Sequence, residues 1–116
     1  GPGYNGGPAG DLLLKVNILS SPVFTREDMN ILTTVSVNFT EAMLGTEVDV
    51  PTLDGSVSLK IPAGTQPGQK FRLKGKGIVT SKATGDEYVT IKVTLPKTLT
   101  DEQKDLIVKF QETLKA

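Results

Sequence analysis

Apolar and polar residues alternate along much of this chain, and the alternation predicts a series of short β-strands. Neighbouring side chains of a strand point to opposite faces, so apolar residues two positions apart share one face. The pattern occurs in six stretches: 11–19, 33–37, 46–52, 56–61, 70–74 and 89–95. Asp54-Gly55 is typical of a tight turn and predicts that the third and fourth stretches form a hairpin. Pro51 has no backbone N–H, so the third stretch is expected at a sheet edge.

A short helix is predicted between the second and third stretches, beginning after Asn38. The Asn38 side chain can accept unpaired N–H groups of the first helical turn, and Glu41 can accept the N–H of Asn38 in return. Gly45 suits the end of this helix, because glycine adopts left-handed backbone conformations without strain.

A longer helix is predicted from Thr100 to Leu114, at the end of the chain. Thr100 and Gln103 form a second pair of reciprocal capping residues. Helical spacing gathers four apolar side chains on one side, which we identify as candidate dimerisation residues: Leu106, Ile107, Phe110 and Leu114. The stripe can cover the chain's own sheet or pack against a second copy, and the sequence leaves both open.

The composition favours an all-β dominated fold and excludes several kinds of chemistry. The 116 residues include 12 glycines and 7 prolines, which implies many turns. Cysteine and histidine are absent, which removes disulfides, thiolate nucleophiles, common zinc sites and histidine acid–base catalysis. The net charge is zero, and no apolar run approaches the roughly 20 residues that span a membrane. We therefore expect no enzyme activity, no cofactor, no metal and no membrane partner.

The chain is expected to divide into four parts. Residues 1–10 are rich in glycine and proline and form a flexible lead-in. Residues 11–31 form the last strand and connector of a preceding subdomain, with Phe24 packing onto the body from a polar connector. Residues 32–97 form a second β-subdomain, and residues 98–116 form the terminal helix.

An internal repeat supports this division. When Gly10-Asp11 is placed over Gly85-Asp86, an offset of 75 residues, the apolar positions of the two following strands coincide. The first strand would then end one copy of the repeat, and the rest of the chain would form the next copy. The repeat predicts a parent protein that is longer at its N-terminus.

Charged residues on the predicted strands form two groups. Glu47 and Asp49 are expected on a solvated strand face, with Arg72 or Lys74 as candidate partners across the sheet. A basic row lies near the fifth stretch and could contact phosphates: Lys70, Arg72, Lys74 and Lys76. No aromatic residue shares its face to stack on bases, so no nucleic-acid partner is expected.

The edge strands are candidates for peptide binding. An exposed edge can accept an extended peptide as an added strand. The candidate residues for this contact come from the second and third stretches: Val35, Val37, Val48 and Val50. The alternative is that these valines are ordinary core residues.

Several motifs, taken in order, resemble the C-terminal region of DnaJ-type J-domain co-chaperones. They run from residue 10 to the terminal helix: Gly10-Asp11-Leu12, 22–26 (PVFTR), 42–45 (AMLG), 50–55 (VPTLDG), 61–66 (IPAGTQ), 71–77 (FRLKGKG) and Gly85-Asp86. The resemblance implies a small β-sandwich-like subdomain of the DnaJ C-terminal type, with one short helix and a C-terminal helix. The family pattern has histidine at Ser21 and glycine at Asp28, so this chain departs from it at both positions.

The resemblance also implies a function. It indicates a co-chaperone module that binds unfolded or partly folded polypeptides, forms homodimers through its C-terminal end, and presents clients to a DnaK-type chaperone. Contact with that ATPase belongs to the J domain, which is missing from these residues, as is the family's cysteine-rich zinc module. The location implied is the cytoplasm or an organelle matrix such as that of the mitochondrion. The alternative is a purely structural β-module whose helix caps its own sheet and which has no client site.

Overall fold

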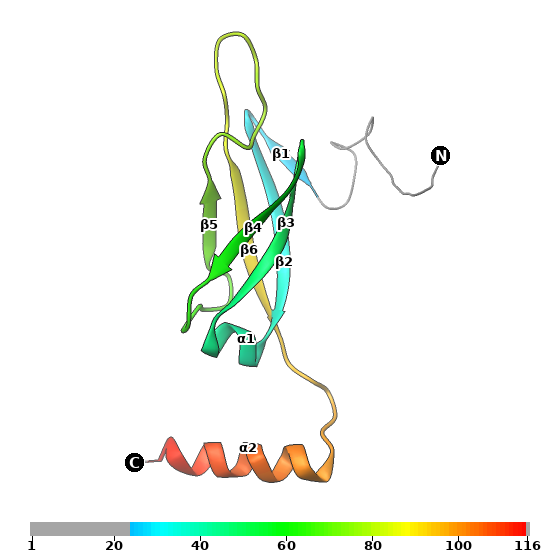
Figure 1. Cartoon of the computed structure of the whole chain (residues 1–116), viewed down its shortest axis with the longest axis vertical. Coiled ribbons are helices and arrows are strands. Elements are labelled where there is room, and N and C mark those ends of the chain that lie inside the picture. Colours follow the sequence, from blue (N-terminus) through cyan, green and yellow to red (C-terminus); the bar gives the residue numbers. More distant parts are fainter. Residues whose placement is uncertain (1–23, 116) are drawn as a thin grey trace, which may run out of the picture.

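The computed structural model describes residues 24–115, and the predicted strand at residues 11–19, the lead-in and the first half of the repeat lie outside them. Six strands and two helices follow one another along the chain (Figure 1). Their bounds are β1 Thr25–Glu27, β2 Asn30–Asn38, α1 Phe39–Leu44, β3 Thr46–Thr52, β4 Gly55–Ile61, β5 Lys70–Leu73, β6 Glu87–Thr94 and α2 Asp101–Thr113.

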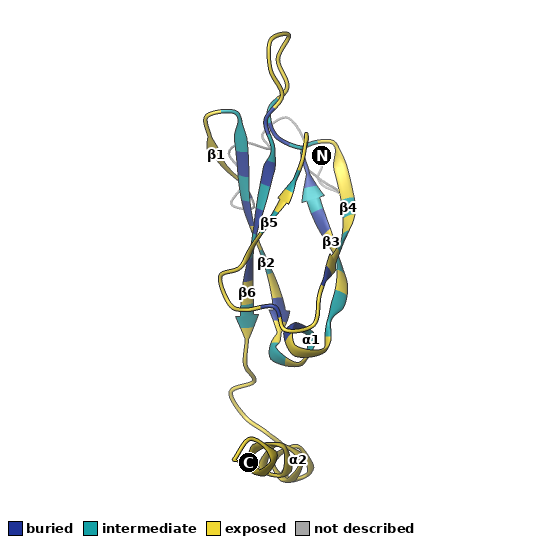
Figure 2. Cartoon of the chain, turned by 90° about the vertical axis from the view of Figure 1, so that its left-hand side faces the viewer, coloured by how far each residue is buried: buried dark blue, intermediate teal, exposed yellow. Residues whose placement is uncertain are grey.

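The strands form two sheets that face each other, which confirms the predicted β-sandwich-like fold. The larger sheet has the order β1-β2-β6-β5, and the smaller sheet consists of β3 and β4. Within the larger sheet β2 and β6 run parallel, whereas β5 pairs antiparallel with β6. Figure 2 shows the two sheets on opposite sides of the buried interior, with α1 closing one end.

Apolar side chains from both sheets fill the space between them. The fully or nearly fully buried members are Val37, Val89 and Ile91 from the larger sheet, Val50 and Ile61 from the smaller sheet, and Ala42 from α1. Phe24 is also buried, as expected from the sequence. The alternation in the sequence therefore identifies the inward faces correctly.

The local signals around α1 and the hairpin are confirmed. The Asn38 side chain accepts a hydrogen bond from the Glu41 N–H at 2.9 Å, and Glu41 Oε1 accepts one from the Asn38 N–H at 3.0 Å. Gly45 ends the helix with a φ of +94°. β3 and β4 pair antiparallel up to Thr52 and Gly55, and Pro51 lies on a strand with one partner among the described residues.

Two boundary predictions are wrong. The segment after Phe24 is not only a connector, because Thr25–Glu27 pairs as β1 with Asn30–Leu32, and β2 therefore begins at residue 30 rather than 33. Asp28 turns this hairpin with a φ of +56°, a left-handed conformation that explains why glycine suits the position. At the other end, β6 stops at Thr94, and Leu95 is 72% exposed instead of facing inward.

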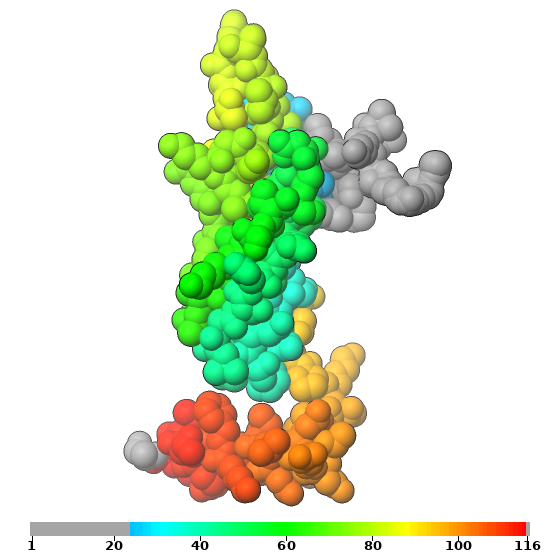
Figure 3. Space-filling model, in the orientation of Figure 1, coloured from blue at the N-terminus to red at the C-terminus, as the bar shows by residue number. Residues whose placement is uncertain are grey.

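Two glycines allow the chain to cross itself closely at the end of the sandwich away from α1. The Met29 carbonyl accepts a hydrogen bond from the Ile78 N–H at 2.8 Å, and the Gly85 N–H donates to the Ile78 carbonyl at 2.8 Å. A Cβ at Gly77 or Gly85 would overlap the Met29 backbone. Glycine at both positions therefore lets the β1–β2 turn approach the base of the loop at residues 78–84. Figure 3 shows this projecting loop at the top of the molecule.

The terminal helix forms as predicted but does not cover its own sheet. Thr100 and Gln103 make the reciprocal capping bonds, at 3.1 Å and 2.8 Å. No described residue of α2 is buried, and Figure 3 shows the helix lying apart from the sandwich. The alternative of a self-capping helix is therefore wrong, because a cap would bury the apolar side of α2 against the sheets.

Candidate functional site

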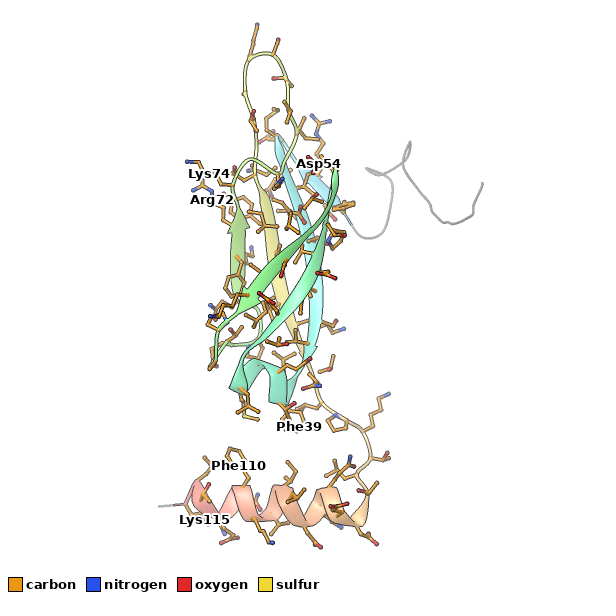
Figure 4. The ribbon with its side chains drawn as sticks, in the orientation of Figure 1. Phe39, Asp54, Arg72, Lys74, Phe110 and Lys115 are labelled. Atoms are coloured by element: carbon orange, nitrogen blue, oxygen red, sulfur yellow. The ribbon has the colours of Figure 1, made fainter. Side chains whose placement is uncertain are left out.

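The apolar side of α2 is the largest set of exposed apolar side chains on one described element. We call it the α2 stripe, and its members with their exposed fractions are Leu106 57%, Ile107 36%, Phe110 46% and Leu114 69%. In Figure 4, Phe110 projects from the side of α2 that faces α1, and Phe39 projects from α1 toward α2. The stripe residues predicted from sequence thus share one accessible surface, which no described residue covers.

Exposed apolar residues also occur on α1, at the end of the sandwich nearest α2. Met43 is 43% exposed and Leu44 is 81% exposed. Leu44 borders a shallow hollow formed by the start of β3 and the end of β4, with Gly45, Glu47 and Ile61 among its lining residues. This end therefore offers a second apolar surface near the α2 stripe.

The four valines predicted to contact peptides lie on the inward faces of β2 and β3. Val37 and Val50 are 3% and 0% exposed, so neither has surface to offer a ligand. Val35 and Val48 are half-buried and pack against the same core. Among the described strands, β1 pairs with β2 only at residues 30–32, and no other described strand pairs with that edge from Thr34 to Asn38.

The basic row lies on β5 and in the loop that follows it, and its ion pair differs from the prediction. Arg72 Nε donates to Asp86 Oδ2 at 2.8 Å, and the Gly75 N–H donates to Asp86 Oδ1 at 2.8 Å. The hydrogen bond from Gly75, followed by that from Arg72, holds the pKa of Asp86 below its ordinary value. Glu47 and Asp49 do not face Arg72 or Lys74, because they lie in the other sheet, opposite Lys60 and Ser58 of β4.

The family of this chain follows from its similarity to known protein families. A model of the DnaJ C terminal domain matches residues 1–96, which is most of the chain. The chain belongs to the DnaJ C terminal domain family. The match includes both sheets and α1, and it confirms the resemblance carried by the ordered motifs.

Relatives named Chaperone protein DnaJ extend the similarity across this DnaJ C terminal domain and into α2. The protein from Exiguobacterium sp. strain AT1b is 51% identical over 114 residues, which are 97% of this chain and 31% of the relative. Those from Ruminiclostridium cellulolyticum and Bacillus velezensis are 47% and 49% identical over 113 residues, which are 96% of this chain and 30% of each relative. The chain thus spans about a third of their length. All three are bacterial, so they give no support to a mitochondrial location.

Sequence reasoning missed one unusual residue of this DnaJ C terminal domain, Glu87. It is 0% exposed at the start of β6, between Leu73 of β5 and Ile31 of β2. Neither carboxyl oxygen has a hydrogen-bond partner among the described residues. Burial raises the pKa of Glu87 from 4.5 to about 7. The signal was present in the alternation, because Glu87 shares a face with Val89 and Ile91.

Two features are absent from residues 24–115. No group of three or more acidic, histidine or cysteine side chains is placed to hold a metal ion. No described helix is long and apolar enough to cross a membrane.

Proposed function

We propose that this DnaJ C terminal domain is a non-enzymatic co-chaperone module that forms homodimers through α2 and binds unfolded polypeptide in the bacterial cytoplasm. The exposed α2 stripe is the observation that carries the proposal. Leu106, Phe110 and Leu114 keep about half or more of their surface in water, so covering them would recover part of the roughly 1.5–3 kcal/mol that full burial of such a side chain provides. A covering surface is therefore favoured.

A second copy of the chain is the occupant that we propose for the stripe. The chain already carries a neighbouring apolar surface at Met43 and Leu44, so a partner helix would meet apolar groups on both α2 and α1. A twofold arrangement places the same surfaces on both partners, which is the common form of small homodimers. Burial of four side chains from each copy would oppose the ordering and association costs of such a dimer.

Substitution of the α2 stripe tests this pairing. The double variant L106S/F110S should be monomeric at concentrations at which the unchanged chain is dimeric, because it removes two of the four apolar contacts from each copy. V108S is the matched control: Val108 is 46% exposed on the same helix but lies about 200° around the axis from Leu106. Light scattering with size-exclusion chromatography should give a dimer mass for V108S, and a dimer mass for L106S/F110S would contradict the proposed pairing.

For the client site, we propose the edge of β2 from Thr34 to Asn38. A client segment would add to this edge as an extended strand and rest on the half-buried side chains of Val35 and Val48. Val37 and Val50 would support this surface from beneath rather than touch the client. Backbone pairing gives little sequence preference, which suits a protein that binds many unfolded clients.

A binding assay with a permanently unfolded polypeptide tests the client site. V35S/V48S should weaken binding of reduced, carboxymethylated lactalbumin about tenfold, because two buried contacts of the client are lost. V57S/L59S is the control, since both residues are half-buried against the same core but lie on β4. Fluorescence anisotropy at a temperature where circular dichroism shows all variants folded separates binding from stability, and an equal loss in both variants would contradict the site.

Presentation of clients to a DnaK-type chaperone is proposed for the longer protein rather than for these residues alone. The resemblance assigns ATPase contact to a J domain with a His-Pro-Asp motif, and the 116 residues contain no histidine. Addition of this chain alone should therefore leave the ATPase rate of a DnaK-type chaperone unchanged.

A further inference from the structure

The outer edge of β5 presents a row of backbone groups and positive side chains that the proposed dimer and client sites do not use. Within the described part of the chain, β5 is the last strand of the larger sheet and pairs only with β6. The Ile91 N–H donates to the Gln69 carbonyl at 2.9 Å, so this carbonyl points toward β6. Since this direction alternates along an antiparallel strand, the backbone groups of Lys70 and Arg72 point to the outer side.

Positive charge accompanies these outward backbone groups. Lys70, Arg72 and Lys74 are exposed and alternate along the chain, on the face away from the core side chains Phe71 and Leu73. Figure 4 shows Arg72 and Lys74 projecting away from the body of the sandwich. An added strand along this edge would therefore lie beside three cations.

Nearby carboxylates neutralise only part of this positive charge. Asp86 takes the hydrogen bonds of Arg72 and Gly75. Asp54 lies near Lys76, and a hydrogen bond from Thr52, helped by the Lys76 charge, lowers its pKa. The Lys74 charge also helps to lower the pKa of Asp86, but neither Lys70 nor Lys74 forms a salt bridge with a carboxylate among the described residues. The β5 edge thus keeps a net positive charge although the whole chain is neutral.

We propose that the outer edge of β5 binds an acidic polypeptide segment in extended conformation, as an added strand. Lysines on an edge strand repel basic segments, and they would lose hydration without compensation beside neutral ones. Both effects discourage unspecific pairing at that edge. An acidic strand reverses these effects. Its alternate carboxylates repeat about every 6.6–6.8 Å, the spacing at which side chains recur on one face of β5. The backbone ladder supplies affinity, and the cations supply selectivity for acidic sequences.

A nucleic acid fits this edge less well than an acidic peptide does. It has no series of alternating N–H and C=O groups to match the backbone of Lys70 and Arg72. The aromatic residue of β5, Phe71, packs against the core, so it cannot stack on bases. The β5 edge is separate from the α2 stripe and from β2, so the inference holds whether or not the chain dimerises.

The test uses the full 116-residue chain and a capped peptide in which glutamate alternates with threonine over seven residues. Binding should shift the NMR signals of the Lys70 and Arg72 amides and slow their hydrogen exchange, because both N–H groups become paired. N-methylation of one alternate set of peptide residues should abolish binding, whereas N-methylation of the other set should leave it intact. That asymmetry is specific to a strand paired along one edge.

Charge variants complete the test. K70E/K74E should weaken binding of the peptide about tenfold or more, because two attractions become repulsions. K82E/K97E makes the same change in net charge at exposed residues away from β5 and should leave the affinity within about twofold. Equal tolerance of both N-methylated peptides, an equal effect of both variants, or tighter binding of a single-stranded oligonucleotide of the same charge would each overturn the proposal.

Discussion

Replacement of Gly85 by alanine is expected to destabilise the folded chain by about 3 kcal/mol or more. The added methyl group would overlap the backbone carbonyl of Met29, which cannot rotate away as the end of a side chain can. To make room, the β1–β2 turn would have to separate from the loop and lose the hydrogen bonds from Ile78 to Met29 and from Gly85 to Ile78. A small domain with a modest core has little stability to spare for this change.

G64A is the matched control for G85A, because it makes the same chemical change at a glycine with open space around it. A Cβ at Gly64 meets nothing within 4 Å, so no overlap is created. The remaining cost comes from the φ of +84°, which alanine adopts at about 1 kcal/mol. Urea unfolding followed by circular dichroism measures both variants. Equal free energies of unfolding for G85A and G64A would show that the close crossing at Met29 does not exist.

The E87Q variant is expected to remove a pH dependence of stability that the unchanged chain shows between about pH 4.5 and pH 7. In this window the unfolded chain releases the Glu87 proton, whereas the folded chain keeps it because burial raises the pKa to about 7. The folded state binds more protons, so the free energy of unfolding falls as the pH rises. The shift corresponds to a loss of about 3 kcal/mol, at 1.36 kcal/mol for each pKa unit.

Urea unfolding at pH 5 and pH 8 tests this expectation. Glutamine keeps the shape of the side chain and carries no charge, so E87Q should have nearly equal stability at both pH values and exceed the unchanged chain at pH 8. E47Q is the control, since Glu47 is exposed on β3 and its removal should leave the pH dependence in place. Parallel pH profiles for E87Q and the unchanged chain would mean that Glu87 is hydrated or paired in the folded state.

Much of the sandwich could be predicted from sequence because its signals are local. Alternation identified the inward faces of β2 to β6, and the side chains of Asn38 and Thr100 marked the starts of both helices. The turn at Asp54-Gly55 fixed the β3–β4 hairpin, because the two arms must pair beside it. Each of these features depends on residues within a few positions of one another.

Features that depend on distant residues could not be predicted in the same way. The parallel pairing of β2 with β6 joins residues that lie 56 positions apart, such as Ile31 and Glu87, and no local pattern specifies it. The roles of Gly77 and Gly85 follow from the approach of Met29, which only the fold reveals. The same holds for the partner of Arg72, which is Asp86 at the start of a later strand rather than a carboxylate on β3.

The candidate sites show the same limit. Helical spacing alone found the α2 stripe, but it could not decide between a cap on the chain's own sheet and an open surface. The valines of β2 and β3 were chosen as peptide contacts from their edge position, yet Val37 and Val50 lie wholly in the core. Exposure depends on how the two sheets pack. The sequence alone therefore could not distinguish the buried Val37 and Val50 from the half-buried Val35 and Val48.

Sedimentation equilibrium of two chain lengths measures whether α2 pairs two copies of the chain. The intact chain and a chain that ends at Lys97, which keeps all six strands and α1, are compared at equal concentration. We predict twice the monomer mass for the intact chain and a single monomer mass for the shortened chain, with unchanged strand content by circular dichroism. The same association state for both lengths would contradict the account.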